Sequence, residues 1–403
     1  MSKYTLEGRV FKLNAAADAE PIIAELNAID GASLEEIVFS GLIVLSWCLS
    51  ASQQQQKTGS TFGVEAAKAV AGALKSKSGL KIANLSDIFT GRLKDEIPQA
   101  LDAFVGAFID KKSLQVIDLS DNAFGPVGAA PIRRLFIENR SISTLKLNNN
   151  GLGIEGGRLI ATSLLDAASA NTSDDEKKPF LPNMHTIIMG RNRLESASAR
   201  NMSLALAVLP NLRELRMPQN GIRPDGIEVL LGALGASCPL LEVLDVQDNT
   251  FTKQGSKALA KALPSWPKLR ILNIGDCLLG KSGSKIFFKA LAPPQSPLLE
   301  TLIFTFNEMD LDGAKLIAAA LANKPKLSKL HLNGNTFDAE DDVVGEIRGI
   351  LRSNGHVDGL DELEDMEEPD SDAEEEENDD EDDEEQKEDD VDALADALGG
   401  VKV

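Results

Sequence analysis

Hydrophobic and polar positions repeat along most of the chain with a regular spacing. Eight times the sequence follows the pattern L-x-x-L-x-[LIVMF]-x-x-[NC], in which the ninth position is asparagine or cysteine. These ninth residues, here called the ladder residues, lie 28 to 30 residues apart except for one interval of 42. They are Asn122, Asn150, Asn192, Asn220, Asn249, Cys277, Asn307 and Asn335. A near-constant period of this kind is typical of leucine-rich repeats.

Each copy of the pattern predicts one short strand and one helix. Alternating apolar residues such as Leu145 and Leu147 predict a strand with one buried face. The ladder residue is expected to hydrogen-bond backbone groups of neighbouring turns. Six of the eight ladder residues are followed six positions later by glycine, and runs such as 227–234 and 257–263 then predict amphipathic helices.

Because one unit cannot bury its apolar side alone, the units are expected to stack into a solenoid. The predicted fold class is α/β, with parallel strands on a concave face and helices on a convex face. A strand followed by a true helix in about 28 residues resembles the ribonuclease-inhibitor-type horseshoe.

The repeats divide the chain into three predicted regions. Residues 1–33 predict a short segment and an amphipathic helix that caps the open end, residues 34–357 the repeat domain, and residues 358–403 an acidic disordered tail. Within the first repeat, residues 42–59 break the pattern, and removing them restores the register at Ser60. We interpret them as a retained intron or gene-model error, with a genuine loop as the alternative.

The charge of the chain is concentrated in the tail. The chain has a net charge of −22, whereas residues 358–403 alone carry −23, which leaves +1 for the remainder. The core of the tail, residues 374–390, has almost no apolar content and is expected to be disordered. Two roles of this tail remain as alternatives, namely keeping the protein in solution and docking a basic partner. Neither part has a basic surplus, so nucleic-acid binding is disfavoured.

Other chemistry has little support in the sequence. Three cysteines are too few and too scattered for a disulfide framework, which fits a reducing compartment. Neither a secretory signal nor a membrane-spanning apolar run is apparent, so we expect a soluble intracellular protein without a membrane partner. The three histidines do not cluster, so no metal site is predicted. No phosphate-binding P-loop occurs, so the chain itself is not expected to bind GTP.

A polar row is predicted beside the ladder. The residue before each ladder position should stack along one rim of the array, and Phe306 and Gly334 end the row. Its polar members are Asp121, Asn149, Arg191, Gln219, Asp248 and Asp276. Such a rim could grip a basic protein surface, while solvated loop residues are the alternative.

The second repeat departs from the rule of the array. Ile88 occupies its ladder position, and the loop that follows is longer than its neighbours, with Arg92 at its tip between Gly91 and Leu93. Function is expected where a loop departs from the pattern. A solvated surface arginine is the alternative reading.

Several rim loops together resemble one family. They are L-S-D-I-F-T-G-R-L-K-D-E-I-P (85–98), L-S-D-N-A-F-G-P (119–126), L-N-N-N-G-L-G (147–153), G-R-N-R-L-E (190–195), Q-N-G-I-R-P-D-G-I (219–227) and Q-D-N-T-F-T (247–252). In these stretches the chain resembles the fungal-type Ran GTPase-activating proteins, and the acidic tail also matches. The resemblance covers nearly the whole chain apart from residues 42–59.

The resemblance implies a GTPase activator that acts in trans on Ran-GTP in the cytoplasm, supports nucleocytoplasmic transport and has no hydrolase site of its own. It implies no cofactor of its own, because GTP and Mg²⁺ are carried by Ran. A monomer is expected, with an accessory Ran-binding protein in a ternary complex as a further expectation.

The resemblance also implies roles for individual residues. Asn149 would position the glutamine of Ran that orients the attacking water. Arg92 would organise the interface and Asn149 rather than insert as an arginine finger. Asn148 stands where the family more often has histidine. The expected partner-binding residues are Lys94, Asp121, Asn122, Asn150, Arg191, Gln219, Asp248 and Asp276. The alternative function is a non-catalytic leucine-rich-repeat binder or inhibitor that would use the concave face.

Overall fold

The structure is a computed structural model that describes residues 2–40, 60–169, 183–294 and 296–367. The insertion predicted at residues 42–59 and the acidic core at residues 374–390 lie outside the described residues, as does Cys48. The described residues belong to one compact unit.

Parallel strands run through the whole repeat unit. Within the described residues, eleven strands form a single sheet in the order β1-β3-β5 and then β6 to β13. The middle residue of a repeat strand is buried, as Leu145 and Ile187 are, and these two pair directly across β7 and β8. The strands are β1 (Ser2–Thr5), β3 (Leu34–Val38), β5 (Ile82–Asn84), β6 (Val116–Asp118), β7 (Thr144–Lys146), β8 (Thr186–Ile188), β9 (Glu214–Arg216), β10 (Val243–Asp245), β11 (Ile271–Asn273), β12 (Thr301–Ile303) and β13 (Lys329–His331). A separate pair consists of β2 (Lys12–Leu13) and β4 (Thr61–Phe62).

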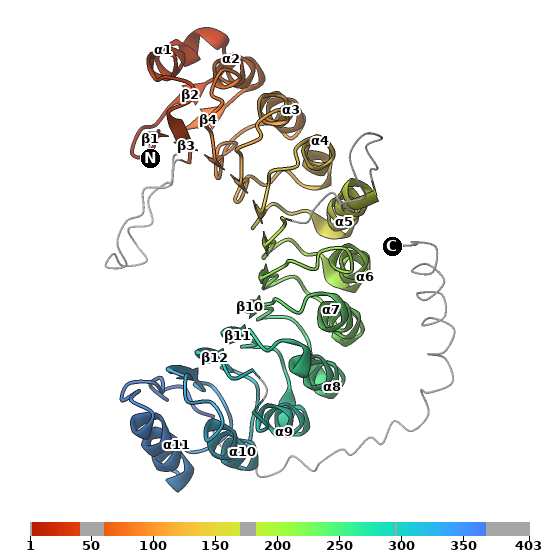
Figure 1. Ribbon diagram of the computed structural model, residues 1–403, viewed down its shortest axis with the longest axis vertical. Helices are drawn as coiled ribbons and strands as arrows, with labels where there is room; N and C mark the ends of the chain where they lie inside the picture. Colours follow the sequence, from red (N-terminus) through yellow and green to blue (C-terminus); the bar gives the residue numbers. More distant parts are fainter. Residues whose placement is uncertain (1, 41–59, 170–182, 295, 368–403) are drawn as a thin grey trace. The chain divides into compact units, whose positions relative to one another are not determined.

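The helices follow one another along one side of this sheet (Figure 1). In α7 the residues Ile227, Leu230, Leu231 and Leu234 are buried at the spacing of one helix face, which packs toward the strands. The helices are α1 (Glu20–Ala28), α2 (Val64–Leu74), α3 (Ile97–Phe108), α4 (Ala129–Glu138), α5 (Gly153–Ser169), α6 (Glu195–Leu206), α7 (Pro224–Ser237), α8 (Thr252–Ala262), α9 (Gly280–Leu291), α10 (Leu311–Leu321) and α11 (Asp342–Ser353). The predicted α/β leucine-rich-repeat solenoid is confirmed.

The glycine six positions after the ladder residue is required by packing. A Cβ atom on Gly226 would lie 2.7 Å from Cγ2 of Ile222 and 2.8 Å from Cα of Ser196. At Gly226 the start of the helix therefore approaches the preceding repeat too closely for a side chain, whereas α6 has a buried serine, Ser198, at the corresponding position.

The ladder residues bond the repeats to one another as expected. Asn122 donates from Nδ2 to the carbonyl oxygens of Leu85 and Leu119, at 2.8 and 2.9 Å, and its Oδ1 accepts from the N–H of Ile88 at 2.9 Å. Cys277 places its sulfur 3.5 Å from the Val246 carbonyl oxygen, and its N–H donates to Oδ1 of Asn307. Each buried amide thus satisfies backbone groups of two turns.

The first repeat keeps the register predicted at Ser60. The N–H of Phe62 donates to the carbonyl oxygen of Ile88 at 3.0 Å, as the N–H of Phe251 donates to that of Cys277 at 2.9 Å. Ser60 is fully buried, as a ladder residue should be. The N-terminal segment also contributes β1, which pairs with β3 and which the repeat pattern did not predict.

The predicted start of the tail at Asp358 differs from the structure. Leu360 bridges to Leu330 in β13, and the carboxylate of Asp361 accepts from the N–H of Leu332 at 2.8 Å. The N–H of Glu367 donates to the carbonyl oxygen of Asn335 at 2.9 Å. The edge of β13 offers unpaired backbone groups, and this acidic segment satisfies them. Residues 358–367 are therefore part of the repeat unit.

Candidate functional site

The polar row forms a regular rim. Its six predicted members have φ between 52° and 61°, in the left-handed region, and all are exposed, whereas the ladder residue after each one is buried. The N–H of Asn149 donates to the carbonyl oxygen of Gly190 at 2.9 Å, and every other member bonds the next repeat in the same way. The backbone therefore fixes where each side chain of the row begins.

Two neighbouring pairs in the row are joined by side-chain hydrogen bonds. Asn149 donates from Nδ2 to Oδ1 of Asp121 at 2.9 Å, and Gln219 donates from Nε2 to Oδ2 of Asp248 at 2.7 Å. An ionised carboxylate can only accept, so the amide nitrogen of Asn149 must be the atom that faces Asp121. The amide oxygen of Asn149 is thereby turned away from Asp121.

Two arginines lie next to Asn149 along the rim. Arg191 occupies the row position of the following repeat, and Arg193 lies just beyond the ladder residue Asn192. Both are exposed, and neither forms an ion pair with any other described residue. The row therefore places an amide and a cationic centre side by side, between carboxylates at Asp121 and Asp248.

The side chain of Arg92 folds back from the tip of its loop. Its Nη2 donates to the carbonyl oxygens of Leu13 and Thr61, both at 2.8 Å, its Nε to Oγ1 of Thr61 at 2.8 Å, and its Nη1 to Oδ1 of Asn14 at 2.7 Å. Partial burial lowers the pKa of Arg92, which as an arginine stays charged. These bonds fasten the loop to β2 and β4.

Arg92 is not brought to Asn149. Its hydrogen bonds lead to the N-terminal segment and the first repeat, whereas Asn149 belongs to the repeat of β7. A Cβ atom on Gly63 would lie 2.9 Å from Nη1 of Arg92, so the guanidinium lies directly on this glycine. Leu93 and Lys94 of the same loop are exposed, so the side chain of Lys94 is available to a partner.

Asn122 and Asn150 do not belong to an accessible site, and their prediction as partner-binding residues is wrong. Asn150 is completely buried, and Asn122 is 2% exposed. Asn150 donates to the carbonyl oxygens of Leu119 and Leu147, and its Oδ1 accepts from the N–H of Asn122. Both amides are occupied by the ladder and cannot reach another protein.

The sequence reasoning missed some members of this rim. Asp87 precedes the ladder position Ile88, has φ of 52° and donates its N–H to the carbonyl oxygen of Ser120. The register alone could have placed it in the row. Leu278, which follows the ladder residue Cys277, was also missed and is 47% exposed, and Phe306, which the sequence placed at the end of the row, is 45% exposed. A shallow pocket of about 270 Å³ lies at Leu278, lined by Gln219, Gly221, Asp248, Asn249, Thr250, Asp276 and Leu278.

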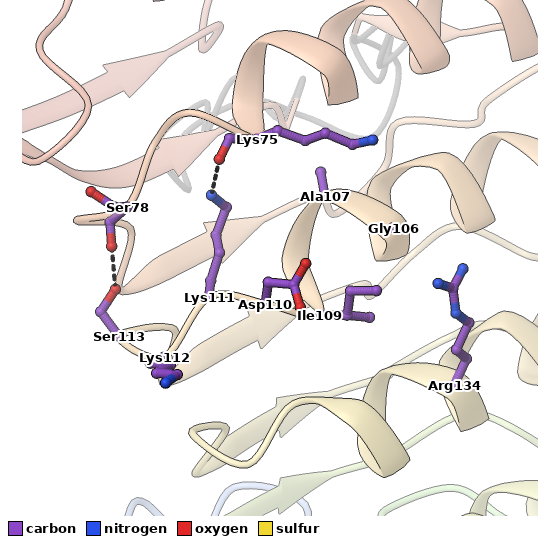
Figure 2. Close-up of a pocket in the computed structure, with 10 residues that line it drawn as sticks. All are labelled: Lys75, Ser78, Gly106, Ala107, Ile109, Asp110, Lys111, Lys112, Ser113 and Arg134. Atoms are coloured by element: carbon purple, nitrogen blue, oxygen red, sulfur yellow. Dashed lines mark hydrogen bonds between the residues drawn. The ribbon is translucent and has the colours of Figure 1, made fainter.

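A larger depression of about 750 Å³ lies at the other edge of the sheet, where the strands begin. Figure 2 shows Nζ of Lys111 directed at the carbonyl oxygen of Lys75, 3.4 Å away. The hydroxyl of Ser113 donates to the carbonyl oxygen of Ser78 at 2.7 Å. Lys111 also donates to the carbonyl oxygen of Lys77 at 2.7 Å, and burial lowers its pKa to about 8. This lysine caps the end of a helix, so its role is structural.

Metal ligands do not gather in the part of the chain that the structure describes, where no group of three or more His, Cys, Asp or Glu side chains could hold an ion. None of the helices among the described residues is both long and apolar enough to cross a membrane.

Comparison with known proteins adds sequence relatives and a structural neighbour. A family model described as "Leucine Rich repeat" matches residues 111–132 and 237–260. Ran GTPase-activating protein 1 of Saccharomyces cerevisiae is 34% identical over 351 residues, which cover 85% of this chain and 80% of that protein. Ran GTPase-activating protein of Drosophila melanogaster is 36% identical and Ran GTPase-activating protein 1 of Xenopus laevis is 36% identical, and the chain spans 52% and 34% of their respective lengths.

Among solved structures, the crystal structure of the Rad7 and Elc1 complex in yeast superposes with a TM-score of 0.51 and 14% sequence identity. The match covers 84% of this chain and 74% of that one. At this identity the likeness shows the fold alone.

Proposed function

This chain belongs to the family of Ran GTPase-activating proteins, and we propose that it stimulates hydrolysis of the GTP bound to Ran through the rim row around Asn149. GTP and Mg²⁺ would be carried by Ran, and the chain would supply positioning and charge. We further infer that it acts in the cytoplasm as a monomer, and that an accessory Ran-binding protein can join the complex. By stimulating GTP hydrolysis on Ran, this chain would support nucleocytoplasmic transport.

The observation that carries the proposal is the hydrogen bond between Asn149 and Asp121. Because this bond fixes the orientation of the amide, Oδ1 of Asn149 is presented to solvent as an acceptor. An acceptor in this place can receive a hydrogen bond from the side-chain amide of Ran's water-orienting glutamine. The glutamine then holds the attacking water in line with the terminal phosphate. No covalent bond to this chain is formed.

Arg92 has a different part in the proposal. Its bonds to Leu13, Asn14 and Thr61 fix the loop that carries Lys94 against the N-terminal end of the array. A fixed loop reduces the entropy lost when a partner binds, which strengthens docking. Arg92 therefore organises the interface, and Lys94 is the cation of this loop that is offered to Ran.

The proposal is tested by single-turnover hydrolysis of GTP on Ran at increasing concentrations of this chain. We expect Asn149→Ala to lower the rate at saturation by roughly 100-fold or more, since a misplaced reacting group typically costs this much. The unfolding midpoint should fall only slightly, because Asn149 is exposed and the main cost is alanine at a φ of 52°. Gln219→Ala is the matched control for the rate at saturation, since it removes another exposed amide that donates to a carboxylate in the same row; as an expected partner-binding residue it should change only the concentration needed for half-maximal rate.

Two outcomes would contradict the proposal. Stimulation that survives Asn149→Ala would remove this residue from the site. A wild-type chain that does not stimulate Ran at all would favour the non-catalytic binder, which would use the concave face formed by the strands. On those strands Arg216 is already paired with Glu214 and Asp245.

A further inference from the structure

Two exposed apolar side chains lie on neighbouring repeats near the C-terminal end of the rim. Phe306 occupies the row position of its repeat, and Leu278 follows the ladder residue Cys277 of the repeat before it. The two repeats are direct neighbours, because β11 pairs with β12. The side chains are 45% and 47% exposed. Single exposed apolar residues are common, but two on consecutive repeats form a patch.

The backbone under this patch is held in an unfavourable conformation. Leu278 has φ of 53° and Phe306 has φ of 52°, in the region where side-chain-bearing residues are disfavoured. At the position of Leu278, other repeats have Gly151 and Gly221 but also Ala123, Arg193 and Glu308, the last three with positive φ as well, so this conformation belongs to the array. What distinguishes Leu278 is a large apolar side chain exposed to solvent, which suits a binding role.

The ring of Phe306 is held in place by the next repeat. Gly334, the following member of the row, has φ of 73°, and a Cβ atom on it would lie 2.2 Å from Cδ1 of Phe306. The ring therefore rests on the backbone of Gly334, and one part of it remains open to solvent. A fixed aromatic ring loses little entropy when it is covered, which suits an anchor for a partner.

Carboxylates surround the two apolar side chains. Asp276 precedes Phe306 in the row, Glu308 follows it two residues later, and both are exposed. Neither forms an ion pair with another described residue. The shallow pocket of about 270 Å³ lies between Asp248, Asp276 and Leu278. We call Asp248, Asp276, Leu278, Phe306 and Glu308 the C-terminal rim patch.

We propose that the C-terminal rim patch is a second docking site for the GTPase whose nucleotide lies at Asn149, and that it takes a lysine or arginine side chain of that partner. Such a side chain has an aliphatic stem for Leu278 and Phe306 and a cationic head for Asp276. Asp248, Asp276 and Phe306 lie three, four and five row positions from Asn149, which for Phe306 is about 24 Å at a strand spacing of about 4.8 Å. A domain with a radius of gyration of about 15 Å spans this distance. This inference rests on the proposed function.

The test compares binding with chemistry in the same single-turnover assay of Ran loaded with GTP. The double variant Leu278→Ala, Phe306→Ala should raise the chain concentration needed for half-maximal rate about 10-fold or more, as expected for two anchors. The rate at saturation should be unchanged. Asn149→Ala should instead lower the rate at saturation and leave the half-maximal concentration nearly unchanged. Val357→Ala removes an exposed apolar side chain outside the rim and should change neither quantity.

The charge of the patch gives an independent readout. Asp276→Lys should raise the half-maximal concentration strongly at low salt and much less at high salt, because exposed charges are screened. A Leu278→Gly variant, which relieves the backbone, should be at least as stable as the wild type and should still bind Ran more weakly.

The outcomes separate the two proposals. If the wild type stimulates Ran, Asn149→Ala does not, and the double variant matches the wild type, the patch is refuted while the function stands. A fall in the saturated rate without weaker binding would also overturn the docking role. A wild type without stimulation would overturn both.

Discussion

Replacement of Arg92 by alanine tests whether this arginine holds its loop in place or takes part in the GTPase reaction itself. The change removes four hydrogen bonds that join the loop after β5 to Leu13, Asn14 and Thr61. The carbonyl oxygens of Leu13 and Thr61 would each lose a charged donor in a partly buried place. The first repeat and the N-terminal segment should therefore loosen, while the later repeats, which do not contact Arg92, should keep their stability.

The size of the effect follows from the bonds. A hydrogen bond to a charged group contributes about 1.5–3 kcal/mol, but these four share one side chain and are only partly buried. A total loss of about 2–4 kcal/mol is therefore expected for the N-terminal repeats. Since about 1.4 kcal/mol corresponds to a factor of ten, amide exchange there should accelerate by roughly 30-fold or more.

Hydrogen exchange measures this locally. The amides of Thr61 and Gly63, which donate to the carbonyl oxygens of Phe11 and Leu13, should lose protection, whereas that of Phe304 in a late repeat should not. In the GTPase assay the half-maximal concentration should rise, with the saturated rate mostly retained. Lys94→Ala is the matched control, because it removes a cation from the same loop without touching these bonds and should leave exchange unaltered.

One result would refute this reasoning. If Arg92→Ala lowered the saturated rate as far as Asn149→Ala does, while exchange at Thr61 and Gly63 stayed as in the wild type, Arg92 would act on the reaction itself. The hydrogen bonds of the isolated chain would then describe only the state before Ran binds.

Three further predictions follow from the rim and the ladder. Asp121→Ala should lower the saturated GTPase rate several-fold by freeing the amide of Asn149, with Asp121→Asn less affected because it can still accept; equal rates in all three proteins would contradict this orienting role. Asn150→Ala should lower the free energy of urea unfolding by about 2–4 kcal/mol, since it leaves buried backbone groups unpaired, whereas Asn149→Ala should cost only about 1 kcal/mol, from alanine in the left-handed region. In a Cys48→Ser variant, native protein should be inert to a thiol reagent at pH 8, because burial raises the pKa of both Cys238 and Cys277 to about 12; rapid labelling would show that the core opens.

The fold could be predicted from the sequence because its period is imposed by packing. Most repeats have alternating apolar residues in the strand, an asparagine in the ladder and a glycine where the helix meets its neighbour, and these residues recur at a regular spacing. The row was found for the same reason, since its members are defined by register alone. Asp87 escaped only because its ladder neighbour is Ile88 rather than asparagine.

Contacts between distant residues could not be read from the pattern. Arg92 bonds residues 31 and 79 positions away, and nothing in a single loop specifies those partners. The acidic segment after Asp358 has the composition of a disordered chain, yet Asp361 binds backbone groups at the edge of β13. Composition describes what a segment can bury by itself, whereas an open sheet edge offers hydrogen bonds that the segment lacks alone.

The neighbouring residues Asn149 and Asn150 show how the array separates structure from function. They are chemically identical, but the left-handed conformation of Asn149 turns its side chain outward, while Asn150 enters the ladder. The inward amide is bonded to three backbone groups and sets the spacing of the repeats. The outward amide has one bond, to Asp121, and keeps its oxygen free. Because the repeat spacing also fixes the distance between Asn149 and Asp121, the ladder that stabilises the fold aligns the group that we propose acts on Ran.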